Sequence, residues 1–109
     1  MYQEALELHR DLGDTFGQAE SHTLLGDALL AMDAPESALR HYRAAVEFLP
    51  HTGERYNLGR IHVGLARTHL RLGEPDLARK HAGLAAGIHG ALGIPEADEA
   101  RALLAALSE

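Results

Sequence analysis

Apolar and small side chains recur along this chain with the three- and four-residue spacing of an amphipathic helix. Between Thr15 and Met32, the positions that follow this spacing are Ala19, His22, Leu25, Gly26, Leu29 and Met32. Between Glu54 and Leu72, they are Leu58, Ile61, His62, Leu65, Ala66, His69 and Leu72. Sustained alternation of apolar and polar residues, which is typical of a half-buried strand, is nearly absent. The pattern therefore predicts an all-α fold.

Glycine and proline divide this pattern into about six helices. Gly13, Gly53 and Gly93 stand where a helix would end in a left-handed residue. Pro35, Pro75 and Pro95 stand at the first position of the helix that follows, each with an acidic residue beside it that favours the helix dipole. The predicted helices cover roughly residues 1–12, 15–32, 35–49, 54–72, 75–91 and 95–108.

The chain also matches itself when it is shifted by 40 residues. His22, Leu25, Leu30, Pro35, Ala38 and His41 recur as His62, Leu65, Leu70, Pro75, Ala78 and His81, and Tyr2, Ala5, Glu7 and Gly13 recur as Tyr42, Ala45, Glu47 and Gly53. A fixed period of this length is typical of stacked helical repeats. We expect one repeat domain over 1–109, with half a repeat in 1–13, full repeats in 14–53 and 54–93, and a first half or capping helix in 94–109. Because both ends fall within a repeat, we expect a fragment of a larger protein.

These repeats resemble the tetratricopeptide repeat (TPR). A unit that starts at Ala19 supplies the consensus positions with His22, Leu25, Gly26, Leu29, Ala38, Tyr42, Ala45 and Pro50, and only His22 departs from the usual residue type. A unit that starts at Gly59 matches the consensus less well, and its weak positions are His69, Ala82 and Gly90. The resemblance implies antiparallel helix pairs in a right-handed superhelix. In it, Gly26, Ala66, Ala38 and Ala78 sit where two helices cross closely, and Tyr42 fills space toward the next pair.

The 40-residue period and the segments Leu-Gly-Asp and Ala-Leu-Arg-His-Tyr are similar to longer TPRs in bacterial transcriptional regulators of the SARP/AfsR type. Scaffold proteins and kinesin light chains contain repeats of this longer kind as well. The resemblance implies a non-catalytic, cytoplasmic interaction scaffold, whose partner is a protein or peptide segment or another domain of the same chain. Two alternatives remain open: a sensor that binds a short peptide or small ligand in the concave groove, and an oligomerisation module that forms homo-oligomers.

Composition narrows the classes of partner. The net charge is −6, which argues against direct nucleic-acid binding by this segment. There is no cysteine, which excludes disulfides and thiolate zinc sites. No apolar run approaches the length of a membrane span. We therefore expect neither nucleic acid nor a membrane as the partner.

In arrays of this family, the first helix of each repeat lines the concave face. The matching positions here are Glu20, Thr23, Asp27, Leu30 and Ala31, then Arg60, Val63, Arg67, Leu70 and Arg71. Arg60, Arg67 and Arg71 share one stripe of their helix, called the arginine stripe below, and guanidinium groups there would hold a partner's carboxylates. The alternative is a local ladder in which Glu20 pairs with Arg60 and Asp27 with Arg67, each pair worth about 0–1 kcal/mol. Ala31 offers Arg71 no such acidic counterpart.

Catalytic, cofactor and metal sites are not expected. No phosphate-binding glycine loop or metal-ligand motif occurs, and His62 and His69 lie about 10 Å apart along one helix, too far to share an ion. We expect His22 and His62 to be packing residues with a local partner, and a pH-sensing role stays open. Leu103 and Leu107 in the last helix form a candidate association surface, or alternatively the inner face of a cap on the helix over 75–91.

Overall fold

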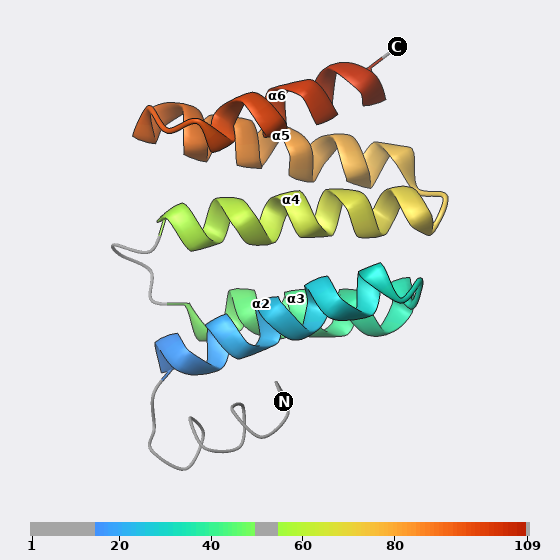
Figure 1. Ribbon diagram of the computed structural model, residues 1–109. Helices are drawn as coiled ribbons and strands as arrows, with labels where there is room; N and C mark the ends of the chain where they lie inside the picture. The colour runs from blue at the N-terminus through green and yellow to red at the C-terminus, as the bar shows by residue number, and fades with distance from the viewer. Residues whose placement is uncertain (1–14, 50–54, 109) are drawn as a thin grey trace. The chain divides into compact units, whose positions relative to one another are not determined.

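The computed structural model describes residues 15–49 and 55–108 (Figure 1). Within these ranges the chain forms five helices and no strand, which confirms the all-α class. The predicted helix over 1–12 lies outside the described residues. The observed helices are α2 (Thr15–Ala31), α3 (Pro35–Phe48), α4 (Arg55–Arg71), α5 (Pro75–Leu92) and α6 (Glu96–Leu107).

The helices belong to two compact units, which divide between Glu54 and Arg55. In the first unit α2 packs along α3, and we call this pair the first hairpin. In the second unit α4 packs along α5 to form the second hairpin, and α6 packs on α5. The predicted boundary between the repeats 14–53 and 54–93 lies one residue before this division, and the repeat bounds themselves stay a prediction.

The two hairpins turn in the same way. Asp33 and Gly73, which are repeat equivalents, both adopt a left-handed backbone with φ of 60° and 74°. Just after them, the amide of Ala34 donates to the carbonyl of Leu29 at 2.9 Å, and the amide of Glu74 donates to that of His69 at 2.8 Å. These bonds satisfy carbonyl groups that the end of a helix leaves without partners. Pro35 and Pro75 then begin the second helix of each hairpin, as predicted.

The first hairpin is held by a large side chain packed against glycine. Tyr42 on α3 is 1% exposed, and its ring lies so close to Gly26 on α2 that a Cβ added there would be 2.9 Å from Tyr42 Cε1. The Tyr42 hydroxyl donates to the carboxylate of Asp27. Tyr42 was predicted to fill space toward the next helix pair, and the structure places its ring against Gly26 of its own hairpin.

Small residues let the helices of the second unit approach closely. The positions equivalent to Gly26 and Tyr42 hold Ala66 and Ala82, and both are fully buried. The second hairpin therefore replaces a glycine and a tyrosine by two alanines. Across the second unit, Val63, Ala85 and Ala100 form one cluster from α4, α5 and α6, with Ala86 and Leu103 packed against it.

A buried histidine joins the start of α4 to the end of α5. His89 is 1% exposed and donates from Nε2 to the carbonyl of Tyr56 at 3.0 Å. Its ring lies against Gly59, where an added Cβ would be only 2.1 Å from Nε2. The Tyr56 ring stacks on His89 with a centroid distance of 5.7 Å.

None of the helices in the described ranges combines the length and the apolar character that crossing a bilayer requires.

Candidate functional site

The predicted concave residues divide between the two units. Those of the first repeat lie on α2, where Thr23 and Leu30 are buried, Glu20 is half-buried and Asp27 is exposed. Those of the second repeat lie on α4, and the most accessible of these are Arg67, Leu70 and Arg71. Of the other two, Arg60 is half-buried and Val63 is buried in the core of the second unit. The exposed candidates on α4 thus combine two guanidinium groups with one apolar side chain.

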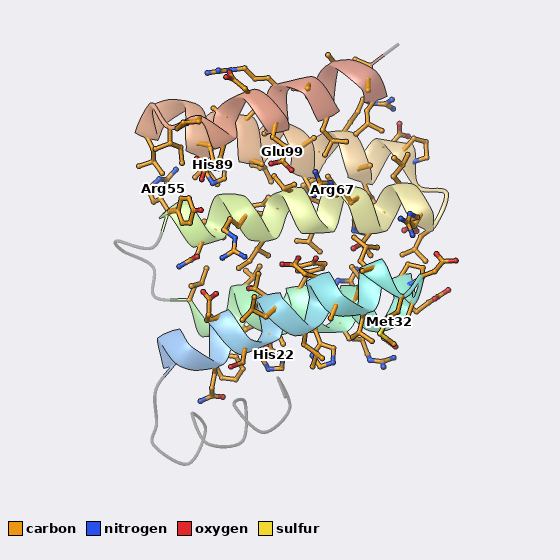
Figure 2. All side chains as sticks on the ribbon, in the orientation of Figure 1. His22, Met32, Arg55, Arg67, His89 and Glu99 are labelled. Carbon is orange, nitrogen blue, oxygen red and sulfur yellow. The ribbon has the colours of Figure 1, made fainter. Side chains whose placement is uncertain are left out.

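Arg67 already holds a carboxylate within the second unit. Its Nη2 donates to Glu99 Oε1 of α6, and Figure 2 shows the two side chains pointing toward each other. Both side chains are about half exposed, at 50% and 51%. An exposed ion pair of this kind stabilises a fold by only about 0–1 kcal/mol, so its carboxylate is easily exchanged. Glu99 is thus an acidic partner of Arg67 within the second unit, and the pairing of Arg67 with Asp27 stays a prediction.

The other two arginines extend the positive surface along α4. Arg60 donates from Nη1 to Asn57 Oδ1 at 3.4 Å, one turn earlier in the helix. Arg71 is the last residue of α4, where a cation is favoured by the negative end of the helix dipole. The arginine stripe therefore runs over the last three turns of the helix and ends at its C-terminus.

One of the two candidate association residues on α6, Leu103, lies on the packed side of the helix. Leu103 is half-buried against the cluster of Val63, Ala85 and Ala100. The carbonyl of Leu107 accepts a hydrogen bond from Arg79 Nη1 of α5 at 2.9 Å. The position of Leu103 fits the alternative in which α6 caps α5. The large apolar side chains exposed elsewhere in the second unit are Tyr56, Leu70, Leu77, Leu84 and Leu92.

Two histidine pairs were not predicted from the sequence. His22 Nδ1 of α2 lies 3.0 Å from His41 Nδ1 of α3, and His62 Nδ1 of α4 lies 2.9 Å from His81 Nδ1 of α5. The pairs are repeat equivalents, and each joins the two helices of its hairpin. The local partner expected for His22 and His62 is thus a second histidine. The signal in the sequence was the spacing of 19 residues, which occurs at the same place in both repeats.

The surroundings of the two pairs differ. In the first, the His22 ring stacks on Phe48 with a centroid distance of 5.6 Å. In the second, the His81 ring stacks on His69 at 5.3 Å, and His69 Nδ1 lies 2.9 Å from Glu74 Oε1. Despite this gathering of imidazoles, no three metal-ligating side chains converge on one point in the described part of the chain.

Burial lowers the pKa of one histidine in each pair. Loss of hydration is the main cause for His41, and the charge of Arg40 lowers its pKa further. Loss of hydration is again the main cause for His62, with the charge of Lys80 as the second cause. Both effects favour the neutral imidazole, and the accepting ring of a hydrogen bond between two histidines must be neutral.

No protein-family model matches the chain, and no curated protein matches it either.

Proposed function

We propose that this chain is a non-catalytic interaction module made of helical-hairpin repeats similar to TPRs. The observation that supports it most is the duplication of the hairpin: both units have the same left-handed turn, the same loop hydrogen bond and the same histidine pair. Proteins built from stacked repeats use the extended surface of their first helices to bind other proteins. We also propose that the hairpin repeats stack into a right-handed superhelix.

The parent protein in this proposal is a cytoplasmic bacterial transcriptional regulator of the SARP/AfsR type. The partner would then be another domain of the same regulator or a separate protein. This part of the proposal rests on the 40-residue period and the repeat motifs. The acidic net charge of −6 supports a protein partner over nucleic acid.

The surface proposed for the partner is the exposed part of α4, formed by Arg67, Leu70 and Arg71. Glu99 shows that a carboxylate fits against the Arg67 guanidinium, and its exposure means that a partner's carboxylate can replace it at little cost. Leu70 is 47% exposed beside these charges and offers apolar contact. A segment that carries acidic residues next to an apolar one matches this surface.

The binding surface is tested with peptides. Acidic peptides are first selected from a display library against the full chain. We expect the Arg67→Ala and Arg71→Ala variants each to bind these peptides about tenfold or more weakly than the wild-type chain. Each change removes one charge-assisted contact worth about 1.5–3 kcal/mol. Affinity should also fall as salt is raised from low to physiological concentration, because exposed charges are screened. Fluorescence polarisation of labelled peptides measures both effects.

Arg101→Ala is the matched control. Arg101 is an exposed arginine of α6 whose Nη1 lies 3.3 Å from Asp98 Oδ1, so its loss changes the net charge equally without touching α4. The affinity of the Arg101→Ala variant for the peptides should stay within twofold of that of the wild-type chain. Equal losses in all three variants would mean that binding follows net charge, which contradicts the proposed surface. A chain that binds no peptide and whose mass in light scattering grows with concentration would favour the oligomerisation module.

A further inference from the structure

Each histidine pair bridges its hairpin at the same place. The ring centroids are 5.2 Å apart in the first pair and 5.1 Å apart in the second, so the rings are in contact across two helices. In both pairs the atoms that face each other are the two Nδ1 atoms. The arrangement is therefore a property of the repeat, and the second unit reproduces it with different neighbours.

This geometry limits how many protons a pair can hold. In the neutral pair one ring donates through its Nδ1–H and the other accepts at a bare Nδ1. A first added proton can go to Nε2 of the donor ring, which keeps the bond. A second proton must go to the accepting Nδ1, where it would face the Nδ1–H of its partner at about 3 Å. The second proton breaks the bond and leaves two cations in contact.

The charged neighbours oppose protonation further. Arg40 directly precedes His41 on α3, and Lys80 directly precedes His81 on α5. In the second pair His69 of α4 stacks on His81, and His69 Nδ1 lies 2.9 Å from Oε1 of Glu74 in the connecting turn. The acids of α6 are directed elsewhere: Glu99 to Arg67, Glu96 to the Tyr56 hydroxyl and Asp98 to Arg101. Leu29 and Ala34 replace His69 and Glu74 in the first repeat.

We propose that the two histidine pairs are acid-sensitive contacts, which hold each hairpin closed near neutral pH and weaken it as the pH falls. An unfolded histidine has a pKa near 6.5, and burial lowers the pKa of His41 and His62 below this value in the folded chain. Between the folded and unfolded values, the unfolded chain binds more protons than the folded chain. The stability that the pairs provide is therefore complete above about pH 6.5 and is lost as the pH falls below it.

The test is the pH dependence of unfolding of the full chain. Each proton taken up on unfolding changes the unfolding constant tenfold per pH unit. We expect the unfolding constant of the wild-type chain, from urea titrations followed by circular dichroism, to rise at least tenfold between pH 6.5 and 5.5. The variant His41→Asn/His81→Asn should show a smaller rise, because an amide occupies the position of Nδ1 and does not titrate in this range.

Ala44→Gly is the control, because it weakens α3 through helix propensity and changes no titratable group. It should keep the wild-type pH dependence at lower stability. If the asparagine variant is as pH-dependent as wild type, the proposal is wrong. If that variant does not fold, imidazole nitrogen NMR of the wild-type chain decides. The proposal is supported if each pair takes up one proton first and a second proton only well below pH 6.5. Four histidines that titrate independently near pH 6.5 overturn it.

Discussion

Replacing Tyr42 by alanine is expected to lower the free energy of unfolding by about 3–5 kcal/mol, the usual cost of truncating a buried aromatic side chain. Tyr42 is 1% exposed and fills the space above Gly26, which has no side chain of its own. The change also removes the hydroxyl that donates to Asp27. Urea unfolding at pH 7.5, followed by circular dichroism, measures the loss.

Two further variants separate the loss of packing from the loss of the hydrogen bond. Tyr42→Phe keeps the ring and removes only the hydrogen bond, so it should cost about 0.5–1.5 kcal/mol. The double variant Gly26→Ala/Tyr42→Ala recreates the alanine pair that Ala66 and Ala82 form in the second hairpin, and it should be more stable than Tyr42→Ala alone. A loss below about 1 kcal/mol for Tyr42→Ala would show that this contact does not hold the hairpin.

Gly59→Ala is expected to destabilise the second unit by at least about 2 kcal/mol. The added Cβ would lie 2.1 Å from His89 Nε2, and the obstacle is a buried ring rather than the end of a flexible side chain. Overpacking costs about 1–3 kcal/mol. Moving the ring also breaks its bond to the Tyr56 carbonyl, and a buried donor left without a partner costs a further ~1–3 kcal/mol.

Gly87→Ala is the matched control for Gly59→Ala. Gly87 lies inside α5, and an added Cβ there meets no atom within 4 Å. It should therefore stabilise the chain by about 0.5–1 kcal/mol through helix propensity alone. Thermal unfolding compares the two variants directly. Similar midpoints for Gly59→Ala and Gly87→Ala would contradict the close contact between α4 and α5.

The helices could be predicted from the sequence because their signals are local. Pro35 and Pro75 mark helix starts, and Gly93 ends α5 in a left-handed conformation with φ of 67°. The turn at Asp33 and Gly73 was harder to predict, because aspartate is an uncommon left-handed residue and only its alignment with Gly73 reveals the shared geometry. Local propensity and the 40-residue period together were enough to predict the all-α class.

The contacts between helices could not be predicted in the same way. His22 and His41 are both ordinary polar residues in their own helices, and their pairing depends on the crossing of α2 and α3. The same holds for Arg67, whose acidic partner in the second unit, Glu99, lies 32 residues further along the chain. The resemblance to TPRs implied that Gly26 and Ala66 are close-packed, but not that Tyr42 covers the first of them.

The most direct test of the proposed interaction module is an NMR map of where a bound acidic peptide lies. Backbone amide shifts of the full chain would be followed during titration with the tightest peptide from the display selection. We expect the largest changes at Arg67, Leu70 and Arg71 of α4 and at Glu99, whose carboxylate the peptide displaces. Changes confined to the exposed leucines of α5, Leu77 and Leu84, with α4 unaffected, would contradict the proposed binding surface.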